Sequence, residues 1–234
     1  MTQDKRPVAG GSNAEIQAFL EQVARTPAVQ PAGARGRLLF GMDATASREP
    51  TWDVACAIQG EMFGETAALG GLDVKLVFYR GFQELKTSAW LSSSAELIPV
   101  MASVRCRGGQ TQIERLLRYA VAETRKTRIN ALVFVGDCVE EQIDALCAAS
   151  GELGMLGVPC FVFHEGHDAH AAGAFRQMAQ LTRGAYCRFD ASSAAQLRQL
   201  LAAVAVYAAG GRRALADYGR REGGAVLQIV HQLG

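Results

Sequence analysis

Three short apolar runs constrain the fold more than any other feature of the sequence. The runs RLLFGMD (37–43), ALVFVGD (131–137) and VPCFVF (158–163) are rich in branched and aromatic residues and show no polar alternation. Strands of this kind are buried on both faces, as happens when helices cover both sides of a parallel sheet. Segments with helical periodicity separate the runs, so we expect an α/β fold with a doubly wound, mostly parallel sheet.

Three further segments complete the expected sheet. LDVKLVFYR (72–80) and AYCRF (185–189) have the composition of strands, and the polar extended segment near 83–90 is typical of an edge strand running the other way. The prediction is therefore six strands with one antiparallel edge and helices on both faces. Helical patterns follow the strands that end near 137 and 166, and other helices are expected over 13–24, 50–68, 112–128 and 192–211.

The chain divides by composition into four parts. Residues 1–24 hold a tail and an amphipathic helix, and residues 25–36 carry the prolines and glycines of a linker. The main domain is expected over 37–211, followed by a C-terminal tail over 212–234.

Charge and apolar content indicate a cytoplasmic protein without nucleic-acid or membrane binding. The formal net charge is +1 and no block of like charges accompanies it. The first ten residues lack the apolar stretch of a secretory signal, and the longest apolar run is shorter than the ~20 residues that span a bilayer. The six cysteines form no CxxC pair, which favours free, buried thiols in a reducing compartment.

Oxygen-bearing side chains follow several of the expected strands. Asp43 and Asp137 end two central strands, Thr45 and Ser47 alternate after Asp43, and Thr111 follows the loop residues RGGQ. Ligands of doubly wound sheets lie beyond the carboxyl ends of the strands, where the strand order reverses. Two carboxylates and three hydroxyls are hard ligands, which predicts Mg²⁺ or Mn²⁺ rather than zinc.

Simpler interpretations exist for each of these residues. Thr111 and Glu114 have the spacing of a capping box, and Ser47 has that of a cap before a helix near Pro50. The two acids could be solvated strand ends. The expectation of a metal site therefore depends on the convergence of three loops at one edge of the sheet.

These motifs resemble the von Willebrand factor A (VWA) domain and its metal-ion-dependent adhesion site (MIDAS). The family's D-x-S-x-S loop matches Asp43, Thr45 and Ser47, its second-loop threonine matches Thr111, and its third-loop aspartate matches Asp137. The likeness runs from about residue 37 to 209. The sequence departs from the family at Cys138, where T-D-G is common, and at Gln110, which separates the glycine pair from Thr111.

The resemblance implies a VWA/Rossmann-like fold and a protein-interaction function. A partner would supply an Asp or Glu carboxylate to the bound Mg²⁺ or Mn²⁺. Intracellular members of bacterial type act beside chaperones or ATPases, so the chain is expected to be an adaptor with such a partner.

Two alternatives remain at this point. A Mg²⁺-dependent phosphatase would use Asp43 as its nucleophile, but Thr45 stands where such an enzyme needs a second acid for general acid–base catalysis. An inert structural subunit with a vestigial metal site is the other. The sequence has neither GxxxxGK[ST] nor G-x-S-x-G, so no enzyme activity is expected.

Two further features lie near the expected site. His164, His167 and His170 in HEGHDAH have the wrong spacing for one zinc site and are interpreted as a polar loop that contacts partners. Cys138 is interpreted as a small residue that fills a turn, in preference to an oxidation-sensitive member of the metal site.

Overall fold

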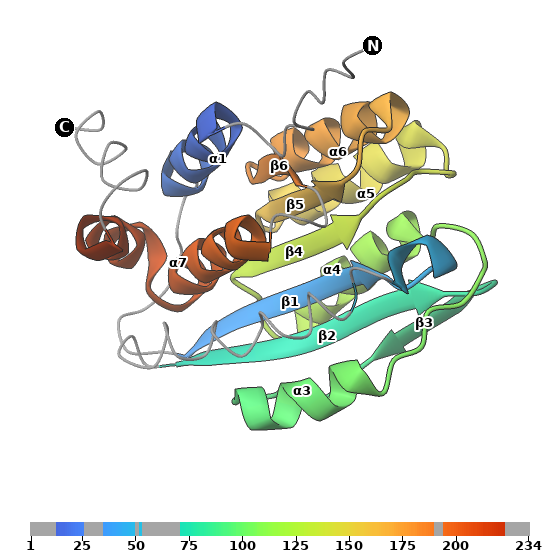
Figure 1. The fold of residues 1–234 in the computed structure, drawn as a ribbon, viewed down its shortest axis with the longest axis horizontal. Coiled ribbons are helices and arrows are strands. Elements are labelled where there is room, and N and C mark those ends of the chain that lie inside the picture. Colours follow the sequence, from blue (N-terminus) through green and yellow to red (C-terminus); the bar gives the residue numbers. More distant parts are fainter. Residues whose placement is uncertain (1–12, 26–34, 50–51, 53–70, 190–193, 223–234) are drawn as a thin grey trace, which may run out of the picture.

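The computed structural model describes residues 13–25, 35–49, 52, 71–189 and 194–222. Its centre is a six-stranded sheet with the order β3-β2-β1-β4-β5-β6 (Figure 1). All neighbouring strands are parallel except β2 and β3, so the predicted antiparallel edge is confirmed. The strands are β1 (Gly36–Asp43), β2 (Leu72–Arg80), β3 (Glu84–Thr87), β4 (Ala131–Gly136), β5 (Cys160–Glu165) and β6 (Ala185–Phe189).

Helices cover both faces of the sheet, as the apolar strands require. Alternate residues of β1 show this, because Leu38 and Phe40 belong to one buried cluster and Leu39 to the other. Figure 1 shows α7 in front of the sheet and α4 behind it. The first cluster includes residues from α1 (Asn13–Arg25), α3 (Ser94–Ala102) and α7 (Ala194–Glu222), and the second those from α4 (Ile113–Lys126), α5 (Ile143–Met155) and α6 (Ala169–Leu181).

The N-terminal helix packs onto the sheet. The Phe19 ring of α1 lies 6.2 Å from the Phe161 ring and 5.3 Å from the Phe163 ring of β5. Val23, one turn further along, is also fully buried. Burying each such side chain stabilises the fold by about 1.5–3 kcal/mol, so α1 is part of the core rather than a free appendage.

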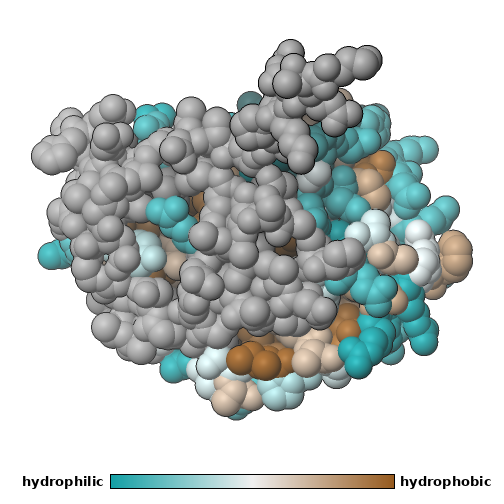
Figure 2. All heavy atoms as spheres, in the orientation of Figure 1, coloured by the Kyte–Doolittle hydropathy of each residue, from teal (hydrophilic) through white to brown (hydrophobic). Residues whose placement is uncertain are grey.

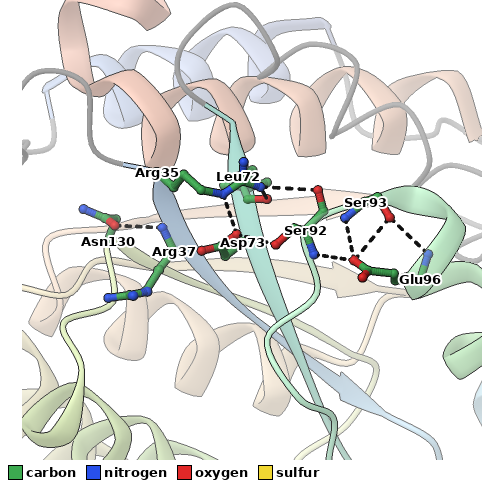
Figure 3. Close-up of polar contacts among 8 residues, drawn as sticks. All are labelled: Arg35, Arg37, Leu72, Asp73, Ser92, Ser93, Glu96 and Asn130. Atoms are coloured by element: carbon green, nitrogen blue, oxygen red, sulfur yellow. Dashed lines mark hydrogen bonds and ion pairs between the residues drawn. The ribbon is translucent and has the colours of Figure 1, made fainter.

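A polar network holds the end of the sheet that lies away from the acids (Figure 3). Asp73 of β2 accepts hydrogen bonds from Arg35 at 2.7 Å and from the Ser92 hydroxyl at 2.8 Å. Ser93 and Glu96 then form a capping box that starts α3. The short polar segment before this helix is therefore fixed to β2, and α3 packs from there against the core.

Some elements differ from the sequence-based expectations. Helix α3 was not predicted, because Pro99 interrupts its apolar pattern. Helix α7 continues past residue 211 to Glu222, with a kink at Gly211, where φ is 69°. The helix expected over 50–68 lies almost entirely outside the described residues. Among the described helices, none is long and apolar enough to cross a membrane.

Candidate metal centre

The acids lie where the strand order reverses. Strand β1 has β2 on one side and β4 on the other, so the chain connections diverge between β1 and β4. Asp43 is the last residue of β1, and Asp137 directly follows β4, its parallel neighbour. Ligands of doubly wound sheets bind at this kind of point. Figure 2 shows that the described atoms at the edge where β1 and β2 end are mainly hydrophilic.

The structure brings Asp43, Asp137 and Cys138 together. One ligand atom from each residue lies within 4.8 Å of the other two. The Asp43 side chain is fully buried, and this burial raises its pKa, with the charge of Asp137 acting in the same direction. Asp43 is therefore not the solvated strand end that the simpler interpretation required.

Two neighbours orient the Asp43 carboxylate. The Thr45 amide donates a 2.7 Å hydrogen bond to Oδ1, and the Tyr79 hydroxyl donates a 3.0 Å hydrogen bond to Oδ2. The Thr45 and Ser47 hydroxyls lie 3.2 Å apart, with Thr45 buried and Ser47 exposed. The D-x-T-x-S loop therefore turns its oxygens toward one small region. Ser47 lies in the short 3-10 helix η1 (Ala46–Arg48), and no side-chain cap begins that helix.

Thr111 is joined to the loop that carries Asp137. Its hydroxyl accepts a 3.0 Å hydrogen bond from the Glu140 amide, and the Glu140 carboxylate accepts a 2.9 Å hydrogen bond from the Thr111 amide. The capping-box interpretation of Thr111 is wrong, because Gln112 is the N-cap of α4 and makes no side-chain cap bond. The Glu141 carboxylate caps the start of α4 instead, by accepting hydrogen bonds from the amides of residues 113 and 114.

The glycine pair before Thr111 brings a third segment to the same edge. A Cβ atom at Gly109 would lie 2.1 Å from the carbonyl oxygen of Gly81, whereas one at Gly108 would meet nothing within 4 Å. The Arg107 amide also donates a 3.0 Å hydrogen bond to the Ala44 carbonyl. The loop of residues 107–111 is thus hydrogen-bonded to the loop that follows β1. Of its two glycines, only Gly109 needs to lack a side chain.

A buried arginine lies against the acids. Arg48 forms an ion pair with Glu165, which ends β5, and only 1% of the Arg48 side chain is exposed. Burial lowers the pKa of Arg48, while the charges of Asp137 and Asp43 raise it. An arginine still remains protonated, so its positive charge offsets part of the carboxylate charge. Sequence patterns missed Arg48 because it looks like an ordinary surface residue of a loop.

His164 contacts the loop that carries Asp137. It is fully buried in β5, so the prediction that it belongs to a polar, partner-contacting loop is wrong for this residue. Its Nε2 lies 3.2 Å from the Asp137 carbonyl oxygen, and its Nδ1 lies 2.8 Å from the Tyr186 hydroxyl. Burial lowers the pKa of His164, which favours the neutral ring. His167 and His170 are exposed, and Asp168 between them caps α6.

A thiol lies beside the two carboxylates. The Sγ atom of Cys138 is one of the three clustered atoms that a metal ion would accept as ligands. Burial raises the pKa of this thiol to about 12, and the charges of Asp137 and Asp43 add to the effect. The described cysteines, which exclude Cys56, are free, but only Cys160 and Cys187 are buried as expected.

The residues at this point fit a divalent cation. The Oδ1 atom of Asp137 is buried and has no hydrogen-bond partner among the described residues. Two carboxylates held this close repel each other, and a cation between them removes that cost. The two carboxylates therefore present to an ion negative charge and one oxygen that the described residues leave unsatisfied.

Solved structures, but not sequence families, resemble this chain. No protein-family model and no curated protein sequence matches the chain. Among solved structures, the VWA domain of SpRpn10 is 12% identical with a TM-score of 0.56, and the match covers 76% of this chain and 98% of that one.

Two longer proteins contain a similar unit. Proximal thread matrix protein 1 (PTMP1) from the mussel byssus is 16% identical with a TM-score of 0.60, over 78% of this chain and 48% of that one. A second structure of PTMP1 has a zinc-occupied MIDAS motif. The pilus adhesin SpaC from Lactobacillus rhamnosus GG is 13% identical with a TM-score of 0.57, over 81% of this chain and 31% of that one. The strand order and these matches together show that the chain has the fold of a von Willebrand factor A domain.

Proposed function

We propose that the chain is a metal-dependent protein-interaction module. The observation that carries this proposal is the pairing of Asp43 and Asp137 at the switch point of the sheet, with one buried oxygen of Asp137 lacking a hydrogen-bond partner among the described residues. Asp43 is fully buried and Asp137 is partly buried, so the pair would be costly without a compensating charge. Arg48 is already paired with Glu165, so a divalent cation would neutralise the two carboxylates.

The proposed ligands are Asp43, Thr45, Ser47, Thr111 and Asp137, holding Mg²⁺ or Mn²⁺. Asp43 and Asp137 supply charge, and the hydroxyls supply neutral oxygens. A bound ion supplies a position that a carboxylate of another protein can occupy. The hydrogen bonds from Tyr79 and Thr45 to Asp43 hold that carboxylate in place before the ion arrives.

The partner in this proposal is a protein that presents an Asp or Glu side chain, such as a chaperone or an ATPase. Two solved structures with this fold are the VWA domain of SpRpn10 and the pilus adhesin SpaC. We place the adaptor in the cytoplasm, with residues 37–211 as the interaction domain, and assign it no catalytic residue and no membrane or nucleic-acid partner.

An affinity capture experiment tests the proposal. Wild-type protein and Asp43→Ala would be used as bait, each with Mg²⁺ or Mn²⁺ and each with a chelator. Partners retained only by the wild type with metal support the interaction module and identify its target. A set of partners that is indifferent to both changes would contradict it.

Catalysis is tested alongside. Phosphate release from a generic ester that depends on Asp43 would favour the phosphatase instead. An absence of any metal effect on both capture and stability would favour an inert structural subunit.

A further inference from the structure

The cluster of Asp43, Asp137 and Cys138 contains a ligand that an oxygen-only site does not need. Each residue offers one ligand atom, and the three atoms lie within 4.8 Å of one another. Cys138 follows Asp137 directly, so the Asp137 loop delivers a hard and a soft ligand to the same point. Thiolates select Zn²⁺ and similar ions, whereas Mg²⁺ prefers oxygen and gains little from sulfur.

We propose that Cys138 is a direct metal ligand and that the site binds zinc-class divalent cations, meaning Zn²⁺, Co²⁺ and Cd²⁺, in preference to Mg²⁺. This inference rests on the proposed metal-dependent interaction and revises only its ion and ligands. Asp43 and Asp137 remain ligands, Cys138 joins them in place of the hydroxyls, and the ion is a thiophilic one.

The geometry suits this assignment. Ligand atoms in a tetrahedral zinc site lie about 3.3–3.6 Å apart, given metal–ligand bonds of about 2.0–2.3 Å. The three atoms lie within 4.8 Å of one another, which is within about 1.5 Å of this spacing.

Metal binding would change the protonation of the thiol. On binding, the Cys138 thiol would lose its proton to solvent as its sulfur bonds to the metal. Two carboxylates and one thiolate would then offset both positive charges of the ion, and the Arg48 guanidinium, which is itself paired with Glu165, lies against the same acids.

The number of ligands explains how such a site could bind a partner. Zinc sites with three protein ligands keep a fourth, exchangeable position, whereas structural sites fill all four. Asp43, Asp137 and Cys138 provide three. The fourth position is then free for water or for the carboxylate of a partner.

Cobalt spectroscopy on the full chain tests the inference. Protein freed of metal with a chelator would be titrated with Co²⁺, and the sulfur-to-cobalt charge-transfer band followed. We expect the band in the wild type and its loss in Cys138→Ser. In that variant Zn²⁺ affinity should fall at least about tenfold, as for other important metal-site residues, while Mn²⁺ affinity stays within about threefold.

Cys106→Ser is the matched control. Cys106 is a partly buried thiol near the same edge, but it is not one of the three clustered residues. The band should survive in this variant. Loss of the band in Cys106→Ser, or its survival in Cys138→Ser, would overturn the inference.

A second measurement avoids any folding defect of the variants. Zn²⁺ should protect Cys138 of the wild type from alkylation, mapped by mass spectrometry, and Mg²⁺ should not. If Mg²⁺ or Mn²⁺ raises the melting temperature but Zn²⁺ neither gives protection nor Co²⁺ a thiolate band, the inference fails and the proposed function stands. If no divalent cation binds, both fail.

Discussion

Arg48 and Glu165 form an ion pair whose side chains are only 1% and 16% exposed, at the ends of η1 and β5. The charges of Asp137 and Asp43 also act on Arg48. One buried cation therefore connects the first loop of the site to the strand beside Asp137. The Arg48 charge should stabilise the fold, because it lies beside acids. The same charge should weaken metal binding, because it repels a divalent ion.

Replacing this arginine should separate the two effects. Arg48→Met leaves Glu165 without its partner and should destabilise the fold by about 3–5 kcal/mol. Metal affinity should rise about tenfold, which corresponds to about 1.4 kcal/mol. Urea denaturation and metal titration measure these quantities.

Two controls accompany this variant. The double variant Arg48→Met/Glu165→Met should recover most of the stability, because removing both charges avoids an unpaired one. Arg107→Met removes a charge from a side chain that is 65% exposed, and should change stability by less than about 1 kcal/mol. Equal metal affinity in the wild type and both Arg48 variants would show that Arg48 does not oppose the ion.

Metal addition should stabilise the wild type but not Asp43→Asn. An ion that binds only the folded state adds about 2.7 kcal/mol at a concentration of 100 times Kd. The variant keeps a side chain of similar shape but loses one charged ligand. Melting temperature with and without chelator measures the effect. A wild-type melting temperature that no divalent cation changes would favour the inert structural subunit.

The two loop glycines should respond differently to alanine. Gly109→Ala places a Cβ atom 2.1 Å from the Gly81 carbonyl oxygen, so the backbone has to move. We expect a loss of about 1–3 kcal/mol and weaker metal binding. Gly108→Ala meets nothing within 4 Å and should change stability by no more than about 0.5 kcal/mol. Equal effects of the two substitutions on the denaturation midpoint would contradict this packing.

The Thr111 hydroxyl should stabilise the loop that carries Asp137 and Glu140 as well as the candidate site. Thr111→Val leaves the Glu140 amide without the 3.0 Å hydrogen bond, which should cost about 1 kcal/mol. Thr111→Ser keeps the hydroxyl and should recover most of this loss. Denaturation of the metal-free protein measures this structural part. If Thr111→Ser is as destabilised as Thr111→Val, keeping the hydroxyl does not rescue the fold and the hydrogen bond to Glu140 is not the source of the loss.

Acid stability should depend on an ion pair away from the candidate metal site. Burial would raise the pKa of Glu123, but the 2.7 Å hydrogen bond from Lys75 and the Lys75 charge, together with smaller contributions from Trp90 and Lys126, outweigh it and lower the pKa. A carboxyl with a lowered pKa in the folded state stabilises the fold above its ordinary pKa of about 4.3 and loses that contribution as pH falls through the folded value.

Glu123→Gln should therefore be less stable than the wild type near pH 7, by about 1.5–3 kcal/mol. The difference should shrink as pH falls from about 4.3 to more acidic values. Urea denaturation across this range measures it. Glu114→Gln is the matched control on the same helix, because its pair with Arg118 is exposed and contributes at most about 1 kcal/mol. A constant gap between wild type and Glu123→Gln at all pH values would contradict the assigned cause.

The sequence alone determined the layers of the molecule and the edge at which its acids lie. The runs 37–43 and 131–137 could be read as strands buried on both faces, because their apolar residues are not interrupted by polar ones. Since parallel strands end at one edge, the positions of Asp43 and Asp137 after two such runs followed from the same pattern.

Only the tertiary structure decided which side chains meet at that edge. Arg48 and Tyr79 carry no motif that marks them, Cys138 was interpreted as a residue that fills a turn, and each reaches the site through contacts between separate segments. Local spacing also suggested a capping box for Thr111, but its hydroxyl bonds to Glu140, 29 residues away. Periodicity reports which face of an element is buried, whereas hydrogen bonds and ion pairs between loops depend on distances that the chain acquires only after the sheet has formed.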